Sequence, residues 1–445
     1  MARLGVSMRK MKDCGIDWIG QVPNDWEITR LRFTAEIVRG GSPRPIESFI
    51  SDDGEGFNWV KIGDADKDNK YITHTSCKII RSGLSKTRMV HANDLILTNS
   101  MSFGEPYIMG IDGCIHDGWV AFSKYKGIVK EFLYWCLLSD LCRIQFEKQV
   151  DGGVVQNLNI DKIGNTIVFL PPLVEQQRIA DFLDEKCGEI DSIRSDIQKQ
   201  IDILNDYKKS VITEAVTKGL NPKAKLKDSG IEWIGKIPEG WMIKRLGTLA
   251  SSKPYSMVDG PFGSDMKNEE YVDEGIPIIQ LTNIKPYYHN IETLKFITEE
   301  KHKQLIRHTA EAGDIAIAKM MPAGRACILS NKYHKYVVAA DAIRFKVNES
   351  NDNRFILYGL NTYCMTECEI VSKGSTRIRI SLEIARKLNL AVPPLSEQKA
   401  IADYLDEKCS EIDATIADKQ KQLETLDEYK KSLIFEYVTG KKECV

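Results

Sequence analysis

Two segments of the chain carry hydrophobic residues at the seven-residue spacing of a helix that packs against another helix. In residues 171–220 the spaced positions are Leu183, Ile190, Ile197, Leu204 and Val211, with Ile193, Ile201 and Tyr207 beside them. In residues 393–442 they are Leu405, Ile412, Leu426 and Leu433, with Lys419 interrupting the series and Ile416 and Leu423 alongside. Each segment opens with a Pro-Pro step and then contains no further proline. The pattern predicts two long helices, each with one buried seam.

The same two segments are copies of one another. At an offset of 222 residues they are identical at 29 of 50 positions, so the chain is a tandem repeat. A second pair, residues 13–31 and 228–246, matches at 11 of 19 positions and contains the motif WIGxxP. We interpret its Trp18, Trp26, Trp233 and Trp241 as packing anchors. Two such helices most simply pack antiparallel, although each could instead lie on its own domain.

Between these repeats lie two regions that differ, residues 32–170 and 247–392. Short apolar runs followed by glycine-containing turns predict strands, and residues 59–65 and the segment from Asn93 parallel residues 278–284 and the segment from Gly313. Residues 130–148 and 353–368 predict a helix near the end of each region. The fold class expected is α+β: two α/β domains joined by two long antiparallel helices, with pseudo-twofold symmetry. The expected domains are 1–170, 171–220, 221–392 and 393–445.

Composition narrows the possible functions. Hydrophobic residues make up 42% and charged residues 28%, as in a globular protein, and the net charge of −2 means that any surface for a polyanion must arise from local segregation of charge. No apolar run long enough for a membrane span or a signal peptide is present, so we expect a cytoplasmic protein. The eleven cysteines form no CxxC motif and the histidines no HxxxH motif, so no metal site is expected.

Motifs for the obvious nucleic-acid enzymes are missing. Neither Pro-Pro step belongs to the [ND]PP[YFW] loop of a DNA adenine methyltransferase, and no GxxxxGK[ST] phosphate-binding loop is present. An enzyme would have to rely on scattered carboxylates, Asp94 with Asp117 and Asp314 with Asp341, which we interpret as turn residues. The chain is expected to be non-catalytic.

The duplicated PPLxEQxxIAxxLDEKxxEID helix, the duplicated WIGxxP segment and the two divergent regions resemble the specificity subunit of a type I restriction-modification system. The resemblance covers nearly the whole chain. It implies two target recognition domains that bind double-stranded DNA and each read one half of a bipartite site. It also implies docking of two adenine methyltransferase (modification) subunits and of restriction/translocase subunits. S-adenosylmethionine and ATP would then belong to those partners, and this chain would carry no cofactor.

Residues that could read DNA are amide, hydroxyl and cationic side chains on the loops of the two domains, because amides pair with adenine edges and cations with guanine edges or phosphates. In the first domain they are Arg44, Lys61, Asn99, Ser100, Gln156 and Asn157. In the second they are Ser264, Lys267, Gln280, Asn283, Lys319, Arg325, Thr376, Arg377 and Arg379. Two other functions remain open: a stand-alone DNA-binding regulator, and a non-catalytic scaffold that binds protein or glycan.

Overall fold

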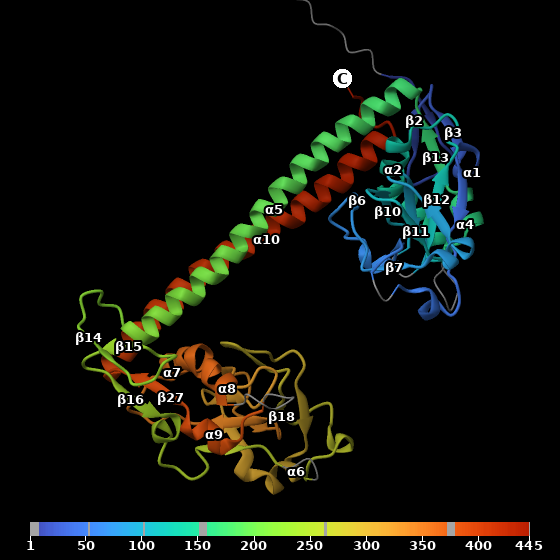
Figure 1. Ribbon diagram of the computed structural model, residues 1–445. Coiled ribbons are helices and arrows are strands. Elements are labelled where there is room, and N and C mark those ends of the chain that lie inside the picture. Colours follow the sequence, from blue (N-terminus) through green and yellow to red (C-terminus); the bar gives the residue numbers. More distant parts are fainter. Residues whose placement is uncertain are drawn as a thin grey trace, which may run out of the picture. The chain divides into compact units, whose positions relative to one another are not determined.

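The computed structural model describes residues 9–51, 54–100, 103–150, 158–261, 265–371 and 379–444 (Figure 1). The chain forms two compact units, Met1–Gln198 with Lys419–Val445, and Lys199–Asp418. The division falls inside both long helices, so each unit holds the start of one helix and the end of the other. None of the helices in the described ranges has the length and apolar character that a membrane-spanning segment needs.

The two predicted long helices are α5, Leu173–Lys218, and α10, Leu395–Val438. Within the first unit, Arg194 of α5 binds Asp427 of α10 at 2.6 Å, and Asp191, one turn earlier in α5, binds Lys430 at 2.6 Å. A later residue of α5 thus pairs with an earlier residue of α10. The paired segments are therefore antiparallel, as predicted. The second unit has the corresponding pair Lys208–Asp413, also at 2.6 Å.

The hydrophobic seam of these helices agrees in part with the predicted stripe. Leu183 and Leu405 are fully buried, and Ile190 and Ile412 are at most 6% exposed. Ile193, placed beside the seam from its spacing, is 49% exposed. Tyr207, also placed beside the seam, is likewise 49% exposed, whereas Ile201 is 5% exposed and belongs to the buried seam.

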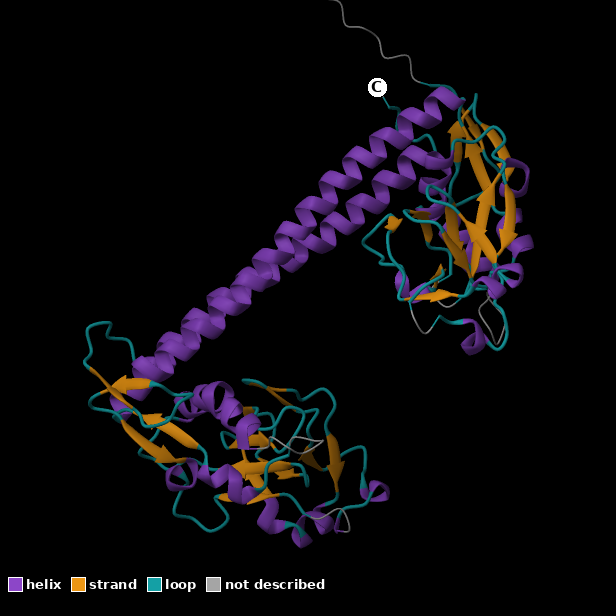
Figure 2. Ribbon diagram, viewed as in Figure 1, coloured by secondary structure: helices purple, strands orange, loops and turns teal. Residues whose placement is uncertain are grey.

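The variable part of the first unit contains two sheets (Figure 2). One has the strand order β4 (Glu36–Arg39), β12 (Trp119–Ser123), β9 (Leu95–Thr98), β10 (Pro106–Met109), β6 (Tyr71–Ile72), and the other β7 (Cys77–Ile79), β5 (Phe57–Val60), β11 (Gly113–Ile115), β8 (Arg88–Val90). Pairs β6–β10 and β5–β11 are parallel, and the remaining neighbours are antiparallel. Leu95, Leu97, Val120 and Phe122 of the first sheet lie in the core.

The second unit repeats this arrangement. Its sheets have the orders β17 (Met257–Asp259), β26 (Ala342–Phe345), β23 (Ile315–Ala318), β24 (Ala326–Ile328), and β21 (Lys295–Ile297), β18 (Ile276–Ile279), β25 (Lys335–Val338), β22 (Thr309–Glu311). Strands β19 (Ile284–Lys285) and β20 (Tyr288–His289) form a separate pair. The parallel pair β18–β25 occupies the place of β5–β11, and β23 occupies that of β9. The two strand correspondences predicted from the sequence therefore agree with the topology.

The helix predicted over residues 130–148 is two helices, α2 (Lys130–Leu138) and α3 (Asp140–Val150). They meet at Ser139, whose backbone is extended and whose hydroxyl donates to the carbonyl of Cys136 at 2.7 Å. The second domain has α7 (Asn353–Gly359), the π-helix η8 (Leu360–Cys364) and α8 (Met365–Val371) in the equivalent place. The remaining helices are α1 (Leu31–Thr34), η1 (Ile46–Phe49), η2 (Ile62–Asp64), η3 (Arg81–Lys86), α4 (Ile160–Asn165), η4 (Leu246–Leu249), η6 (Asn268–Glu270), α6 (Glu299–Gln304), η7 (Ile306–His308) and α9 (Leu382–Lys387).

Each WIGxxP motif lies in a hairpin followed by a strand that pairs with the end of its domain. The hairpins are β1 (Met11–Asp13) with β2 (Gln21–Pro23), and β14 (Leu226–Asp228) with β15 (Lys236–Pro238). The following strands, β3 (Glu27–Arg30) and β16 (Met242–Arg245), pair with β13 (Ile167–Leu170) and β27 (Asn389–Val392) directly before α5 and α10. The repeated sequence thus has a repeated structure.

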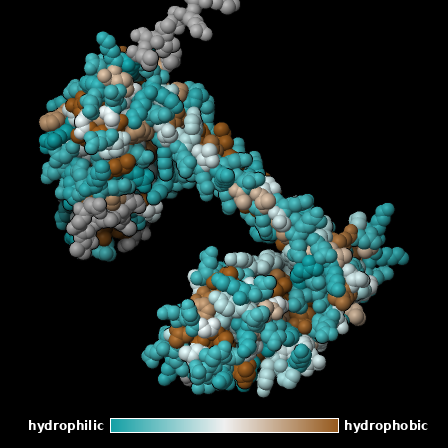
Figure 3. Space-filling view, turned by 180° about the vertical axis from the view of Figure 1, so that it is seen from behind, coloured by the Kyte–Doolittle hydropathy of each residue, from teal (hydrophilic) through white to brown (hydrophobic). Residues whose placement is uncertain are grey.

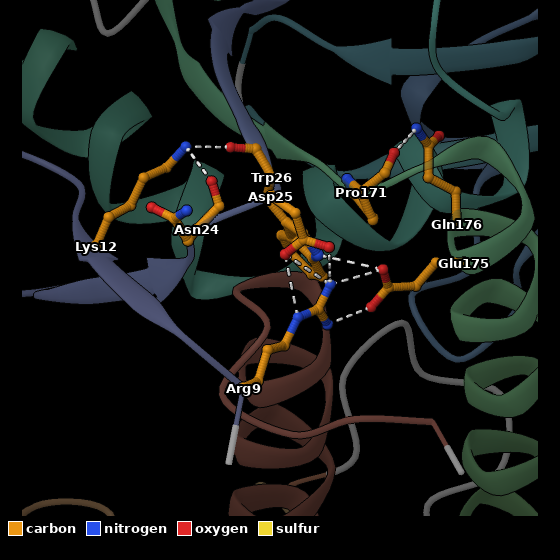
Figure 4. A network of polar contacts seen from close by, with 8 residues as sticks. All are labelled: Arg9, Lys12, Asn24, Asp25, Trp26, Pro171, Glu175 and Gln176. Carbon is orange, nitrogen blue, oxygen red and sulfur yellow. Dashed lines mark hydrogen bonds and ion pairs between the residues drawn. The ribbon is translucent and has the colours of Figure 1, made fainter. Parts of the chain in front are cut away.

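The repeated tryptophans connect these hairpins to the long helices, and Figure 4 shows Trp26 and Glu175 of the first repeat. Trp26 is 1% exposed, and its indole N–H donates to Glu175 in the first turn of α5 at 3.3 Å. Trp241, also 1% exposed, donates in the same way to Glu397 of α10 at 3.2 Å. The interpretation of these two tryptophans as packing anchors is confirmed.

The C-terminal end of each long helix packs against the hairpin of the other repeat. Gly219 follows α5 and Gly440 follows α10, both with positive φ, the conformation of a helix C-terminal cap. A Cβ at Gly219 would lie 3.3 Å from the ring of Trp241, and a Cβ at Gly440 would lie 3.1 Å from the ring of Trp26. Each tryptophan therefore holds the start of one long helix and the end of the other.

Candidate nucleic-acid interface

Some of the predicted DNA-reading residues lie at one edge of the central sheet in each domain. Asn99 follows β9, and its N–H donates to the carbonyl of Gly118 at 2.9 Å; Lys319 follows β23, and its N–H donates to the carbonyl of Asp341 at 2.8 Å. Their own carbonyls accept from Leu158 and Ile380, each at 2.9 Å. Asn99 and Lys319 therefore occupy the same position in the two domains.

In the first domain, Asp117 organises this edge. Its carboxylate accepts from the Ser42 hydroxyl at 2.7 Å and from Arg44 at 3.4 Å, and Arg39 lies at 3.9 Å. The hydroxyl of Ser42 stabilises the charged form, so the pKa of Asp117 is lowered. The Arg44 side chain remains 81% exposed, which leaves its guanidinium accessible to a ligand.

Asn99 and Ser100 lie close to this acidic centre. Asn99 is 1% exposed, and its side-chain oxygen has no hydrogen-bond partner within the described part of the chain. The Ser100 hydroxyl lies 2.8 Å from the position that a Cβ on Gly118 would take. Amide and hydroxyl groups at this edge are suited to reading base edges.

Lys61 lies with Arg44 around a pocket of ≈ 760 Å³. The pocket is lined by Ser42, Pro43, Arg44, Pro45, Ile46, Glu47, Ile50, Trp59, Lys61, Cys77 and His116. The rings of Trp59 and His116 lie 6.1 Å apart. Burial lowers the pKa of His116 against the opposing effect of Asp117, which favours the neutral ring. Trp59 and His116 were not predicted, because the contact of a strand residue with a residue of a distant turn leaves no pattern in the sequence; Trp59 is 3% exposed and His116 is partly exposed.

In the second domain, the same edge carries two cations instead. The Lys319 ammonium donates to Asp259 at 3.2 Å and to the carbonyl of Ala340 at 3.1 Å, and Arg379 binds Asp341 at 2.7 Å. Lys319 is 8% exposed, whereas the Arg379 side chain is 50% exposed. Asp259 was not predicted, and Asp117 and Asp341 were considered only as enzyme carboxylates, because only the folded chain brings these three residues beside the cations.

Two other predicted residues, Asn283 and Arg325, stabilise the turn after β18. Asn283 is fully buried; its side chain accepts from the N–H of Gln280 at 2.9 Å and donates to the carbonyl of Asn290 at 3.0 Å. Arg325 is 9% exposed and donates to the carbonyls of Ile284 and Leu281, both at 2.8 Å. Burial lowers the pKa of Arg325. These bonds hold the turn that follows β18.

Of the remaining predicted residues, two lie elsewhere in the second domain and five lie outside the described residues. Lys267 is exposed beside η6, where its N–H donates to Glu270 at 2.7 Å. Gln280 donates to the hydroxyl of Tyr271 at 3.3 Å. Five predicted residues lie outside the described residues: Gln156, Asn157, Ser264, Thr376 and Arg377.

The carboxylates considered for an enzyme do not form pairs. Asp94 precedes β9 and accepts from the N–H of His91 at 2.7 Å, whereas Asp117 lies beyond the other end of that strand. Asp314 likewise precedes β23 and binds Arg344 at 2.8 Å, at the opposite end from Asp341. Within the described ranges, no cluster of three or more His, Cys, Asp or Glu side chains could hold a metal ion.

Comparison with known proteins supplies an independent line of evidence. The family described as type I restriction modification DNA specificity domain matches residues 23–203 and 238–425, one match in each repeat. The chain is 24% identical over 446 residues to the type I restriction enzyme MjaVIII specificity subunit of Methanocaldococcus jannaschii, covering 95% of this chain and 94% of that protein. It is 23% identical over 353 residues to the type I restriction enzyme EcoBI specificity subunit of Escherichia coli, covering 75% and 68%.

Solved structures share the fold. A chain from work on complex assembly and conformational transition of the type I R-M system superposes with a TM-score of 0.73 at 18% identity, covering 95% of this chain and 99% of that one. The HsdS subunit from Thermoanaerobacter tengcongensis superposes with a TM-score of 0.51 at 18% identity, covering 95% and 98%. The arrangement of two α/β domains and two long helices is thus shared with both.

Proposed function

Because this chain belongs to the type I restriction-modification DNA specificity family and is the DNA specificity subunit of such a system, we propose that its two variable domains each read one half of a bipartite, asymmetric DNA site. By its family the chain is a non-catalytic subunit of the complex. The domain boundaries proposed are 1–170 and 221–392 for the two target recognition domains and 171–220 and 393–445 for the helices between them.

One observation carries this proposal: two equivalent scaffolds present different side chains at the same edge. Asn99 and Lys319 share a backbone position, but one offers a neutral amide and the other a cation. Gly118 likewise corresponds to Asp341. An amide pairs with an adenine edge and a cation with a guanine edge or a phosphate, so the two domains would read different bases. The site they read together would be asymmetric.

The residues proposed for direct contact are the amide, hydroxyl and cationic candidates named from the sequence, apart from Asn283 and Arg325. They are Arg44, Lys61, Asn99, Ser100, Gln156 and Asn157 in the first domain, and Ser264, Lys267, Gln280, Lys319, Thr376, Arg377 and Arg379 in the second. Asn283 and Arg325 were included from the sequence. We assign them a supporting role, since their donors already bind carbonyls of the turn after β18.

The chain would act in the cytoplasm within a larger assembly. Two adenine methyltransferase subunits that use S-adenosylmethionine would dock on the two equivalent hairpin and helix surfaces, since a repeated surface accepts two copies of one partner. Restriction/translocase subunits that use ATP would join them. The bound DNA would be methylated or cleaved by these partners.

The test is adenine-methylation mapping of genomic DNA from cells that express the partner methyltransferase with and without this chain. A bipartite, asymmetric motif that appears only with the chain is the expected result, and exchanging residues 247–392 for the same region of a relative should change one block of the motif. Methylation that does not depend on the chain would refute the proposal. The methyltransferase expressed alone is the control.

A further inference from the structure

The pocket beside Arg44 has the size and lining of a ligand site rather than of a packing gap. Its volume of ≈ 760 Å³ lies within the range of about 300 to 1,000 Å³ typical of small-molecule sites. The walls are mainly apolar, from Ile46, Ile50 and Cys77, with the flat rings of Trp59 and His116. This lining suits a flat, partly apolar ring.

The pocket has few polar groups, among them a ring nitrogen of His116 and, at its rim, the side chains of Arg44, Lys61 and Glu47. The N–H of Gly118 donates to Nδ1 of His116 at 2.8 Å, so in the neutral ring the proton is on Nε2. No described residue accepts a hydrogen bond from that Nε2–H, which leaves it as a donor for an acceptor atom on a ligand. Arg44 and Lys61 lie at the exposed rim, where Glu47 is the acidic residue of the lining and Arg44 also binds Asp117 at 3.4 Å.

The second domain lacks these aromatic walls. Trp59 pairs with Cys114 across β5 and β11, as Ile278 pairs with Val337 across β18 and β25. Ile278 and Ala339 therefore stand where the first domain has Trp59 and His116. The backbone is alike, since a Cβ at Gly40 would lie 2.1 Å from the carbonyl oxygen of His116, and one at Gly260 would lie 2.1 Å from that of Ala339. The pocket lining is specific to the first domain.

We propose that this pocket holds one nucleobase displaced from the duplex at the half-site read by the first domain. Trp59 and His116 contact the face and edge of the ring, Nε2–H of His116 donates to a ring nitrogen or carbonyl oxygen, and Arg44 and Lys61 bind the flanking phosphates. A base taken out of the stack needs an aromatic, apolar pocket and an electrostatic rim, and this chain provides both. The inference rests on the proposed DNA-reading function.

The experiment measures DNA binding by the complex of this chain with its partner methyltransferase, on duplexes with one mispair at each position of the first half-site. A mispair removes the cost of unpairing, so we expect one position at which it tightens binding by about tenfold or more. His116→Ala should abolish that tightening and His116→Gln, which keeps an N–H donor, should retain part of it. His91→Ala, at an exposed histidine of the same domain, is the matched control.

The outcomes separate this inference from the proposed function. If the bipartite methylation motif depends on the chain but no mispair in the first half-site tightens binding, the pocket does not hold a base and only this inference fails. Tightening that persists in His116→Ala also overturns it. If His116→Ala instead releases the methyltransferase from the complex, the pocket holds a side chain of that partner, and the inference is again wrong.

Discussion

Gln176, in the first turn of α5, shows how one buried side chain joins three parts of the chain. Its amide oxygen accepts from the N–H of Val129 at 2.7 Å, and its amide nitrogen donates to the carbonyls of Gly127 and Pro171, both at 2.9 Å (Figure 4 shows the bond to Pro171). In the second repeat, Gln398 accepts from the N–H of Asp352 and donates to the carbonyl of Pro393 in the same way, but its third bond is to the side-chain oxygen of Asn351. The residue is repeated because the junction is repeated.

Gln176→Ala should destabilise the first unit by about 3 kcal/mol, since three buried backbone groups lose their partner. Calorimetry of the full chain should then show the unfolding temperature of that unit lowered by several degrees. The adjacent Gln177 is exposed and binds only Asp181 at 2.8 Å, so Gln177→Ala is the matched control and should change little. Equal effects of the two variants would show that the buried bonds contribute nothing net.

His289, on β20, makes the second unit sensitive to pH. It is 5% exposed, and its Nδ1 accepts from the N–H of Ser330 at 3.0 Å. Burial lowers the pKa of His289 from 6.5 to about 4. Between these values the unfolded chain binds a proton that the folded chain does not, so stability falls as pH decreases from 6.5 toward 4.

We expect this titration to remove up to about 3 kcal/mol of stability across that window. His289→Asn keeps an acceptor for Ser330 but cannot be protonated, so its stability should vary less with pH, even if it is lower at pH 7. Urea unfolding of parent and variant between pH 7 and pH 4 measures the difference. Parallel pH profiles would contradict the assignment to His289.

Helices could be predicted from the sequence where nearby residues mark their start and their buried face. The Pro-Pro steps and the seven-residue stripe predict the two long helices, and α5 and α10 begin two residues after the first proline of each step. The break at Ser139 was missed, because the apolar residues on either side continue in a helical pattern. Only the bond from its hydroxyl to Cys136 and the extended backbone end α2 there.

The candidate site was less predictable than the helices. Arg44, Asn99 and Lys319 were predicted only as loop residues, and the fold brings them to one edge in each domain because loops that follow strands of one sheet collect there. Arg325, chosen for its charge, instead binds two backbone carbonyls of a turn about forty residues earlier. Contacts between side chains and distant backbone groups leave no periodic trace in a sequence, so such roles emerge only from the fold.

The seam between α5 and α10 permits a matched test at the scale of one helix. Ile190 is 6% exposed and Ile193, three residues later, is 49% exposed. Ile190→Ala should cost about 2 to 4 kcal/mol, while Ile193→Ala should stay within about 0.5 kcal/mol of the parent. The helix-propensity change is the same in both variants, so the difference reports packing alone. Urea denaturation of the full chain measures it, and similar costs would show that the seam is placed wrongly.

Across the whole molecule, positive and negative charges nearly balance, and the surface carries both hydrophilic and hydrophobic residues. The net charge is −2, and the face seen in Figure 3 is mainly hydrophilic, with hydrophobic residues in small separate groups. A near-neutral chain has no general attraction for DNA, so affinity must come from a few cations placed at the right loops. Arg44 and Arg379 are exposed cations at equivalent edges of the two domains, each bound to an aspartate of the same edge.

These two arginines should therefore act on different halves of the DNA site. In the complex with the methyltransferase, Arg44→Ala should relax the first block of the methylated motif and preserve the second, and Arg379→Ala should do the reverse. A lost base contact should cost about 1 to 3 kcal/mol for the cognate base, whereas a lost phosphate contact should weaken all sequences alike and reduce the salt dependence of binding. Methylation mapping and binding at several salt concentrations distinguish the two roles. If either variant alters both blocks, the domains do not read independently, and the division of the site between them is wrong.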